Sequence, residues 1–318
     1  MQLVPKLYVV IPCYNEEEVL PETEKRLSDK LNRMISEKII SEDSRIVFVD
    51  DGSKDKTWTI IEEMYGNNPL VLGIKSSRNR GHQNTLLEGL ITVKNDCDVV
   101  ISMDADLQDD IEVLDQFIEK YTAGCDIVYG VRSARKKDTW FKKTTAEGFY
   151  KLMNGMGVNI VYNHADYRLM SARAIAELDG FKEVNLFLRG IVPMIGFQTD
   201  VVEYERNERF AGESKYPLKK MIAFAVDGIT SLSVKPIRLI TSLGIIIFFA
   251  SIILLLYYLI SYLLGHEVVK GWTTLILSIW AIGGLELLAI GIVGEYVGKI
   301  YLESKHRPRF IVEKYLKK

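Results

Sequence analysis

The chain has 318 residues, of which 48% are hydrophobic and 26% charged, and its formal net charge is −2. A charge so close to zero gives no general attraction to nucleic acid, so we expect no nucleic-acid partner. The three cysteines, Cys13, Cys97 and Cys125, form no C-x-x-C pair. This pattern argues against a zinc site and favours reduced thiols buried in a cytosolic domain.

The first half of the chain alternates short apolar runs with helical stretches. The runs predict strands at Leu7–Pro12, Arg45–Asp50, Leu70–Ile74, Asp98–Met103 and Ile127–Tyr129. The stretches between them predict helices over Glu17–Glu37, over Lys56–Tyr65 with Asp55 as N-cap, through Leu86 to Leu90, and over Ile111–Tyr121. Such alternation is typical of an α/β fold with a mainly parallel, Rossmann-like sheet covered by helices on both faces.

Four consecutive predicted strands end in polar, turn-forming clusters. These clusters are P-C-Y-N-E-E at 12–17, V-D-D-G-S-K-D-K-T at 49–57, S-R-N-R-G at 77–81 and D-A-D-L-Q at 104–108. One such cluster is ordinary turn chemistry. Open α/β sheets, however, bind ligands at the carboxyl edge of their strands, and four clusters at one edge predict a nucleotide pocket.

The last cluster places Asp104 and Asp106 one residue apart after a buried strand. Carboxylates suit Mg²⁺ or Mn²⁺, which are commonly held by one or two acids together with the phosphates of a nucleotide. A D-x-D pair by itself is equally compatible with two solvated loop acids. The three neighbouring clusters favour the metal.

The C-terminal part of the chain is apolar. Leu239–Gly265 contains no charged residue and is longer than the roughly 20 residues that span a bilayer, and Gly271–Gly294 contains one acid, Glu286. We therefore expect two transmembrane helices. An acid inside a span is usually functional or paired, so Glu286 has a functional role or mediates packing between subunits.

The distribution of lysine and arginine predicts the orientation of the two spans. The loop between them carries one strong base, Lys270, and Lys235 and Arg238 precede the first span. The strong bases that follow the second span are Lys299, Lys305, Arg307, Arg309, Lys314, Lys317 and Lys318. We expect a multi-pass membrane protein with both termini and the first domain in the cytoplasm. The start of the chain lacks the pattern of a cleaved signal peptide.

Just before the first span, Met221, Ile222, Ala225 and Ile229 share one helical face. This suits a helix lying along the membrane surface, and a plain core helix is the alternative. The predicted division is a cytoplasmic α/β domain at 1–215, a juxtamembrane amphipathic helix at 216–236, a two-helix transmembrane hairpin at 237–300 and a basic cytoplasmic tail at 301–318.

The four strand-end clusters resemble the signatures of the family 2 glycosyltransferases of the GT-A fold. Further matches are Y-G-V-R-S-A-R at 129–135, H-A-D-Y-R-L-M at 164–170 and R-F-A-G-E-S-K-Y at 209–216. With the two spans, these resemble the polyisoprenyl-phosphate glycosyltransferases, a group that includes dolichol-phosphate mannose synthases and bactoprenol glucosyltransferases. The resemblance covers essentially the whole chain.

The resemblance implies roles for individual residues around the donor. It places the nucleotide against Pro12, Tyr14, Glu16, Asp51 and Asp104. It makes Asp106 the main ligand of a Mg²⁺ or Mn²⁺ ion, with Asp104 beside it and Gln108 as a weaker metal-side contact. Such an ion neutralises the charge that develops on the leaving diphosphate.

The implied acceptor is a lipid monophosphate, whose second pKa near 6 makes it largely anionic at neutral pH. It therefore needs neutralisation and orientation more than a general base. The candidates for binding it are Arg132, Arg135, Arg209, Ser214 and Lys215, and each arginine taken singly is also compatible with a solvated surface charge. Together with Arg132 and Arg209, the catalytic candidates include Asp166, either as the base or as a group that orients the sugar or the acceptor.

The expected function is inverting transfer of one sugar, UDP-glucose being the favoured donor, to undecaprenyl phosphate for modification of a surface polysaccharide. GDP-mannose, UDP-N-acetylglucosamine and aminoarabinose-type donors stay open. The chain has no Q-x-x-R-W motif, which argues against a processive polysaccharide synthase. A non-catalytic membrane scaffold would lack the metal acids, yet both are present. The resemblance also implies a homotetramer.

Overall fold

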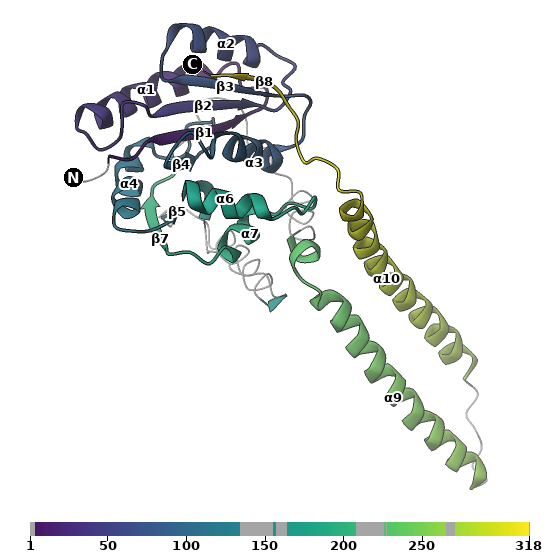
Figure 1. The fold of residues 1–318 in the computed structure, drawn as a ribbon. Coiled ribbons are helices and arrows are strands. Elements are labelled where there is room, and N and C mark those ends of the chain that lie inside the picture. The colour runs from purple at the N-terminus through teal and green to yellow at the C-terminus, as the bar shows by residue number, and fades with distance from the viewer. Residues whose placement is uncertain are drawn as a thin grey trace.

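A computed structural model describes residues 4–133, 155–156, 164–207, 226, 228–264 and 271–317. Its centre is an eight-stranded sheet in the order β7-β5-β6-β4-β1-β2-β3-β8 (Figure 1). The strands are β1 (Leu7–Cys13), β2 (Arg45–Asp50), β3 (Val71–Ser76), β4 (Val99–Ser102), β5 (Ile127–Arg132), β6 (His164–Ser171), β7 (Thr199–Tyr204) and β8 (Val312–Leu316). Neighbouring pairs are parallel except where β6 and β8 take part, so the predicted mainly parallel α/β sheet is confirmed.

Helices cover both faces of the sheet because its strands are apolar on both sides. One face packs against α1 (Leu20–Ser36), α2 (Thr57–Asn67) and α4 (Leu114–Thr122). The other packs against α3 (His82–Val93), α6 (Ala172–Gly180) and α7 (Leu188–Met194). Alternate residues of β1 divide between the two cores: Val9 faces the first and Val10 the second, and neither is exposed.

Local chemistry shifts some predicted boundaries. The helix α1 begins at Leu20, later than predicted, with a proline in its first turn, where the missing N–H costs nothing. The predicted N-cap Asp55 accepts a hydrogen bond from the backbone N–H of Thr57 at 3.0 Å, as α2 begins. Ahead of α4 stands a short 3₁₀ turn, η1 (Ile111–Val113), in which Asp110 accepts a hydrogen bond from the backbone N–H of Glu112 at 2.9 Å.

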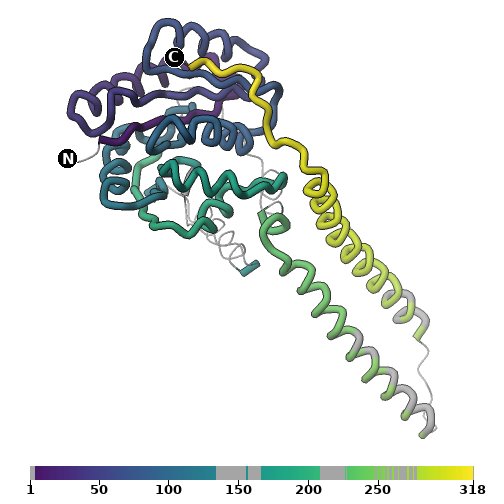
Figure 2. The backbone as a smooth tube through the Cα atoms, in the orientation of Figure 1, coloured from purple at the N-terminus to yellow at the C-terminus, as the bar shows by residue number. Residues whose placement is uncertain are grey.

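Three strands were not predicted from the sequence. β6 inserts antiparallel between β4 and β5, and β7 continues the sheet beyond β5. β8 comes from the predicted basic tail and pairs antiparallel with β3, so the last part of the chain returns to the sheet after the apolar helices (Figure 2). The tail therefore contributes to the α/β domain.

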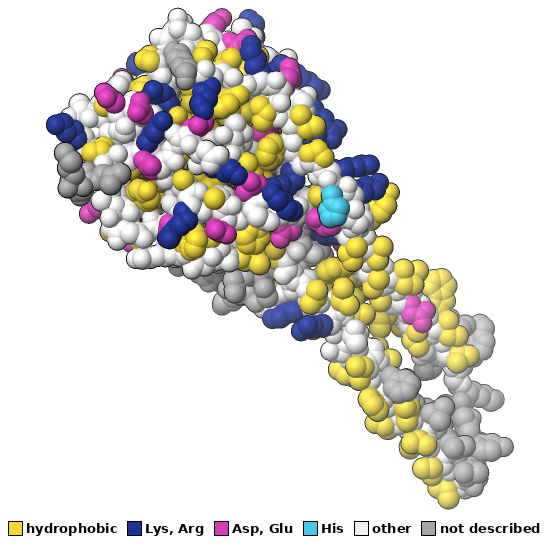
Figure 3. Space-filling model, viewed as in Figure 1, with side chains coloured by type: hydrophobic (Ala, Val, Ile, Leu, Met, Phe, Trp, Pro, Cys, Tyr) yellow, Lys and Arg dark blue, Asp and Glu magenta, His cyan; other side chains and the backbone are white. Residues whose placement is uncertain are grey.

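Two long helices, α9 (Lys235–Leu263) and α10 (Trp272–Ser304), extend away from the sheet (Figure 1). Both are long and apolar enough to cross a membrane, and hydrophobic side chains dominate their surface (Figure 3). At the sheet end, the Tyr296 hydroxyl donates to the Ser233 carbonyl at 2.5 Å. Much of the predicted juxtamembrane helix lies outside the described residues, and the predicted domain boundaries stay predictions.

Candidate active site

The carboxyl ends of the central parallel strands meet at one edge of the sheet. The backbone N–H of Asp51, after β2, donates to the Cys13 carbonyl of β1 at 2.9 Å. The N–H of Met103, after β4, donates to the Val10 carbonyl at 3.2 Å. The polar clusters that follow β1, β2 and β4 are therefore neighbours, as the sequence predicted.

Asp51 ties the fourth cluster, which follows β3, to the same edge. Its two carboxylate oxygens accept hydrogen bonds from the backbone N–H groups of Arg80 at 2.6 Å and Gly81 at 2.9 Å. The next residue, Gly52, has a φ of +64°, and a Cβ added there would lie 2.8 Å from the backbone of Arg78. Only glycine fits a left-handed turn packed so closely. Asp51 is buried and thus shapes the loop ahead of α3.

The other nucleotide candidates lie at or just after the end of β1. Pro12 is buried within β1, Tyr14 is 42% exposed and Glu16 is half-buried. Asn15, at a φ of +55°, joins the ends of β1 and β2, because its side-chain oxygen accepts a hydrogen bond from the N–H of Lys54 at 2.9 Å. An open cavity of about 510 Å³ lies here; its lining residues include Asn15, Glu16, Val19 and Lys54.

Asp104 stands at the centre of a group of acids. Its carboxylate lies 3.6 Å from Nε2 of His82, at the start of α3. Loss of hydration raises the pKa of Asp104 to about 6, and the charges of Asp109, Asp166 and Asp106 act in the same direction against the opposing effect of His82. So much negative charge in one place favours binding of a cation.

Asp166, on β6, is enclosed by cations. Its carboxylate contacts Arg168 at 2.5 Å and Arg189, from α7, at 3.1 Å, and it lies 3.7 Å from Nε2 of His82. Desolvation acts to raise the pKa of Asp166, but Arg189, His82 and Arg168 outweigh it and hold that pKa well below its usual value. A carboxylate so stabilised is a poor proton acceptor, which favours the orienting role over the base.

The acids at the end of β4 fit a divalent cation that is completed by its substrate. Asp106 is 9% exposed, and its Oδ1 accepts a hydrogen bond from the N–H of Gln108 at 3.1 Å across a turn in which Leu107 has a φ of +58°. Among the described residues, no group of three or more acids, histidines or cysteines is placed to hold a metal. Asp104 and Asp106 match an ion that takes one or two carboxylates and fills its shell with phosphate oxygens.

Gln108 is hydrogen-bonded to an arginine beside the acidic loop, and its role as a metal-side contact stays a prediction. Its side-chain oxygen accepts a hydrogen bond from Nη2 of Arg206, which follows β7. The amide therefore links the acidic loop to the end of β7, and its oxygen is occupied by an arginine.

Arg132, at the end of β5, is fixed next to the acidic loop. Its Nε donates to the Tyr204 hydroxyl at 3.2 Å, and that hydroxyl donates to the buried Asp109 carboxylate at 2.5 Å. Arg132 also lies 3.7 Å from Asp109 directly. The remaining acceptor candidates, Arg135, Arg209, Ser214 and Lys215, lie outside the described residues.

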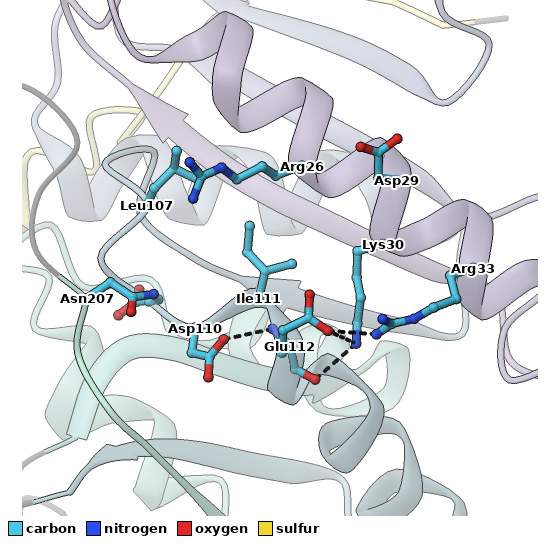
Figure 4. Close-up of a pocket in the computed structure, with 10 residues that line it drawn as sticks. Arg26, Asp29, Lys30, Arg33, Leu107, Asp110, Ile111, Glu112 and Asn207 are labelled. Carbon is cyan, nitrogen blue, oxygen red and sulfur yellow. Dashed lines mark hydrogen bonds and ion pairs between the residues drawn. The ribbon is translucent and has the colours of Figure 1, made fainter.

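A second cavity, of about 530 Å³, lies beside the acidic loop on the α1 side (Figure 4). Its lysine and arginine side chains are held by acids: Lys30 and Arg33 contact Glu112 of η1 at 3.3 and 2.7 Å. These cations fix η1 against α1. The cavity is thus a neighbour of the site, and its basic side chains serve the fold.

Sequence reasoning missed several side chains that build the site. His82 directly follows the third polar cluster, Arg168 lies within the H-A-D-Y-R-L-M match at 164–170, and Arg189 stands out in the sequence only as a basic residue. Asp109 directly follows the D-A-D-L-Q motif, and this adjacency was a signal that could have found it. Tyr204 carried no signal, because its strand was not predicted.

Comparison with known proteins matches residues 8–179 to the model of the glycosyl transferase family 2. The chain belongs to this family. The matched range includes β1 to β6, and with them Asp51, Asp104, Asp106 and Asp166. The predicted family is therefore confirmed, and this family 2 glycosyltransferase is an enzyme of sugar transfer.

Relatives extend the similarity over the whole chain. The uncharacterized glycosyltransferase YkoT of Bacillus subtilis (strain 168) is 55% identical over 98% of this chain and 92% of its own. The bactoprenol glucosyl transferase of Shigella phage SfV is 40% identical over 97% of this chain and 98% of its own. A solved mannosyltransferase from Pyrobaculum calidifontis, in complex with GDP-Man and Mn2+, covers 94% of this chain and 85% of its own at a TM-score of 0.44 and 16% identity. That last similarity is too distant for any inference about residues.

Proposed function

We propose that this glycosyltransferase transfers glucose from UDP-glucose to undecaprenyl phosphate, with inversion, and so makes a lipid-linked sugar for surface polysaccharide. The observation that carries the proposal is the 40% identity, over nearly the full chain including both apolar helices, to proteins named bactoprenol glucosyl transferase. The acids at the carboxyl edge of the sheet supply the donor site that such a reaction requires.

On the donor side, Asp106 and Asp104 would hold the Mg²⁺ or Mn²⁺ ion. When bound, that ion neutralises the leaving diphosphate. Glu16 lines the open cavity at the ends of β1 and β2, where a nucleoside has room, and the exposed Tyr14 follows β1 directly. Asp51 acts indirectly by shaping the loop ahead of α3.

On the acceptor side, the lipid phosphate is already an anion, so proton removal contributes little. Arg132 is held in place by Tyr204 and Asp109 and offers a guanidinium fork to a phosphate. Asp166, fixed as a carboxylate by Arg168 and Arg189, orients the sugar or the acceptor. Arg135, Arg209, Ser214 and Lys215 complete the proposed acceptor site.

The arrangement also supports the proposed topology in the bacterial-type plasma membrane. β8 follows α10 and pairs with β3, so the chain beyond the hairpin lies on the same side as the sheet. The bases flanking the hairpin favour a cytoplasmic location for that side. The proposed homotetramer rests on the family resemblance.

The test is incubation of the full chain with undecaprenyl phosphate, Mg²⁺ or Mn²⁺ and a panel of labelled nucleotide sugars. We expect label in a lipid-linked product from UDP-glucose, and a loss of more than about 100-fold in Asp106→Ala, since metal stabilisation of such charge is worth several kcal/mol. The control Asp29→Ala changes an exposed acid of α1 and keeps activity. If the label comes from another nucleotide sugar, that sugar replaces UDP-glucose as the proposed donor. A labelled product without lipid indicates a different acceptor. Full activity in Asp106→Ala refutes the metal site.

A further inference from the structure

The short helix α7 lies between the candidate active site and the membrane hairpin. Toward the site, Arg189 of α7 contacts Asp166 through Nη2 at 3.1 Å and Nε at 3.4 Å. The N–H of Leu188, the first residue of α7, donates to the side-chain oxygen of Gln83 at 2.8 Å. Gln83 is the neighbour of His82, which lies against Asp104 and Asp166. The start of α7 is thus connected directly to Asp166 and, through Gln83 and its chain neighbour His82, indirectly to Asp104.

Toward the membrane, the segment that enters α7 is bound by the end of α10. Both carboxylate oxygens of Glu303 accept hydrogen bonds from the backbone N–H of Val184, each at 2.9 Å. Oε1 also accepts from the N–H of Asn185 at 2.8 Å and from its side-chain nitrogen at 2.7 Å. One half-buried side chain at the end of α10 therefore satisfies three donors just ahead of α7. Nearby, Arg309 donates to the Phe181 carbonyl at 2.6 Å.

Packing supports the same connection. A Cβ added to Gly190 of α7 would lie 2.1 Å from Cδ1 of Leu232, which stands just ahead of α9. Leu232 therefore rests directly on the backbone of α7. In turn, Lys299 of α10 donates to the hydroxyl of Ser231 at 2.9 Å. The segment just ahead of α9 thus contacts α7 through Leu232 and the end of α10 through Ser231.

We propose that Glu303 is a positioning residue for sugar transfer: it fixes residues 183–187, and through them α7, so that Arg189 stays aligned with Asp166. This inference rests on the proposed function only in its kinetic test, which measures sugar transfer to undecaprenyl phosphate. It gives the hairpin a role beyond anchoring, because the end of α10 sets the geometry of a group in the active site. Charge-assisted bonds from a carboxylate to backbone N–H groups are among the stronger contacts available for this.

The kinetic test uses the full chain in lipid nanodiscs and compares Glu303→Ala with Glu313→Ala. Glu313 belongs to the same C-terminal segment, lies on the edge strand β8 and pairs with Lys75 of β3 at 2.9 Å. We expect kcat to fall at least tenfold in Glu303→Ala, with donor affinity changed less than twofold, and to stay unchanged in Glu313→Ala. Glu303→Gln, which keeps one acceptor oxygen, should recover part of the loss.

A double variant separates positioning from general stability. If Glu303 acts through α7, then Glu303→Ala causes no further loss of kcat in an Arg189→Ala background. An equal loss in both backgrounds, or an equal loss in Glu313→Ala, overturns the proposal. If Glu303→Ala does not fold, Glu303→Gln is measured instead, in the native and Arg189→Ala backgrounds, and the same two outcomes decide the proposal.

Amide hydrogen exchange provides a readout independent of the acceptor. We expect residues 183–194 to exchange at least tenfold faster in Glu303→Ala or Glu303→Gln than in the native chain, with Glu313→Ala unchanged. Unchanged exchange in the Glu303 variants overturns the proposal. A native chain that transfers no sugar to undecaprenyl phosphate would refute the proposed function, while the exchange experiment would still decide the role of Glu303.

Discussion

Replacing Tyr204 with phenylalanine removes one oxygen atom and tests how Arg132 is held. The hydroxyl of Tyr204 donates to Asp109 at 2.5 Å and accepts from Arg132 at 3.2 Å. Its ring stays packed, since it meets Tyr167 edge-on with centroids 5.2 Å apart. The substitution therefore removes two hydrogen bonds to charged groups and leaves the packing unchanged.

The size of the effect follows from those two bonds. A hydrogen bond to a charged group contributes about 1.5–3 kcal/mol net, and the direct contact between Arg132 and Asp109 at 3.7 Å compensates part of the loss. We expect a net cost of about 1.5–3 kcal/mol in the placement of Arg132. Since about 1.4 kcal/mol is tenfold, kcat/KM for the lipid phosphate should fall roughly 10- to 100-fold.

The assay varies undecaprenyl phosphate at saturating donor, and measures donor binding separately by calorimetry. The control is Tyr167→Phe, which removes a hydroxyl that donates to the Asp110 carbonyl at 2.9 Å instead of holding Arg132. We expect the control to lose some stability and to keep its acceptor kinetics. If Tyr204→Phe weakens donor binding as much as acceptor use, the assignment of Arg132 to the acceptor is wrong.

Two further predictions concern the donor edge. Asp51→Asn leaves one acceptor oxygen for the two backbone N–H groups ahead of α3. Because this loss is worth about 1–3 kcal/mol, donor affinity measured by calorimetry should fall about 5- to 100-fold. Unchanged affinity would show that this loop does not shape the nucleotide site. Gly52→Ala places a Cβ in a left-handed turn, 2.8 Å from backbone atoms, so the free energy of unfolding should fall by more than about 1–2 kcal/mol. The control is Gly66→Ala in α2, where an added Cβ meets no atom of the surrounding structure within 4 Å, and this variant should be neutral or stabilising. Equal midpoints of thermal unfolding for the two glycine variants would contradict the steric argument.

The central sheet and its acidic edge were predictable because their signals are local. Uninterrupted apolar runs predicted β1 to β5, and each run ended in residues that turn the chain. Asp104 and Asp106 were found because an apolar strand stops abruptly in acids. The two apolar helices were equally clear, since their length and near absence of charge match what the hydrocarbon core of a bilayer requires.

Other parts depend on contacts between distant segments, and no local pattern predicts them. β6 alternates charged and apolar residues, and its place beside β4 became clear only from the pairing of Val99 with Ser171. The ion pair of Arg189 with Asp166 joins α7 to β6 and has no signature in either segment. β8 was hidden because lysines in the tail suggested a solvated end, whereas Lys314 pairs with Glu62 at 2.6 Å across the sheet edge.

The return of β8 to the sheet has a consequence for biosynthesis. Chains are made from the N-terminus onward, so β3 emerges long before the strand that covers its outer edge. Until α9, α10 and β8 have been synthesised, the backbone N–H and C=O groups on that edge have no strand to pair with, and exposed strand edges promote aggregation. Completion of the sheet must therefore wait until both apolar helices have been synthesised, and a chain that stops before β8 would keep an exposed strand edge.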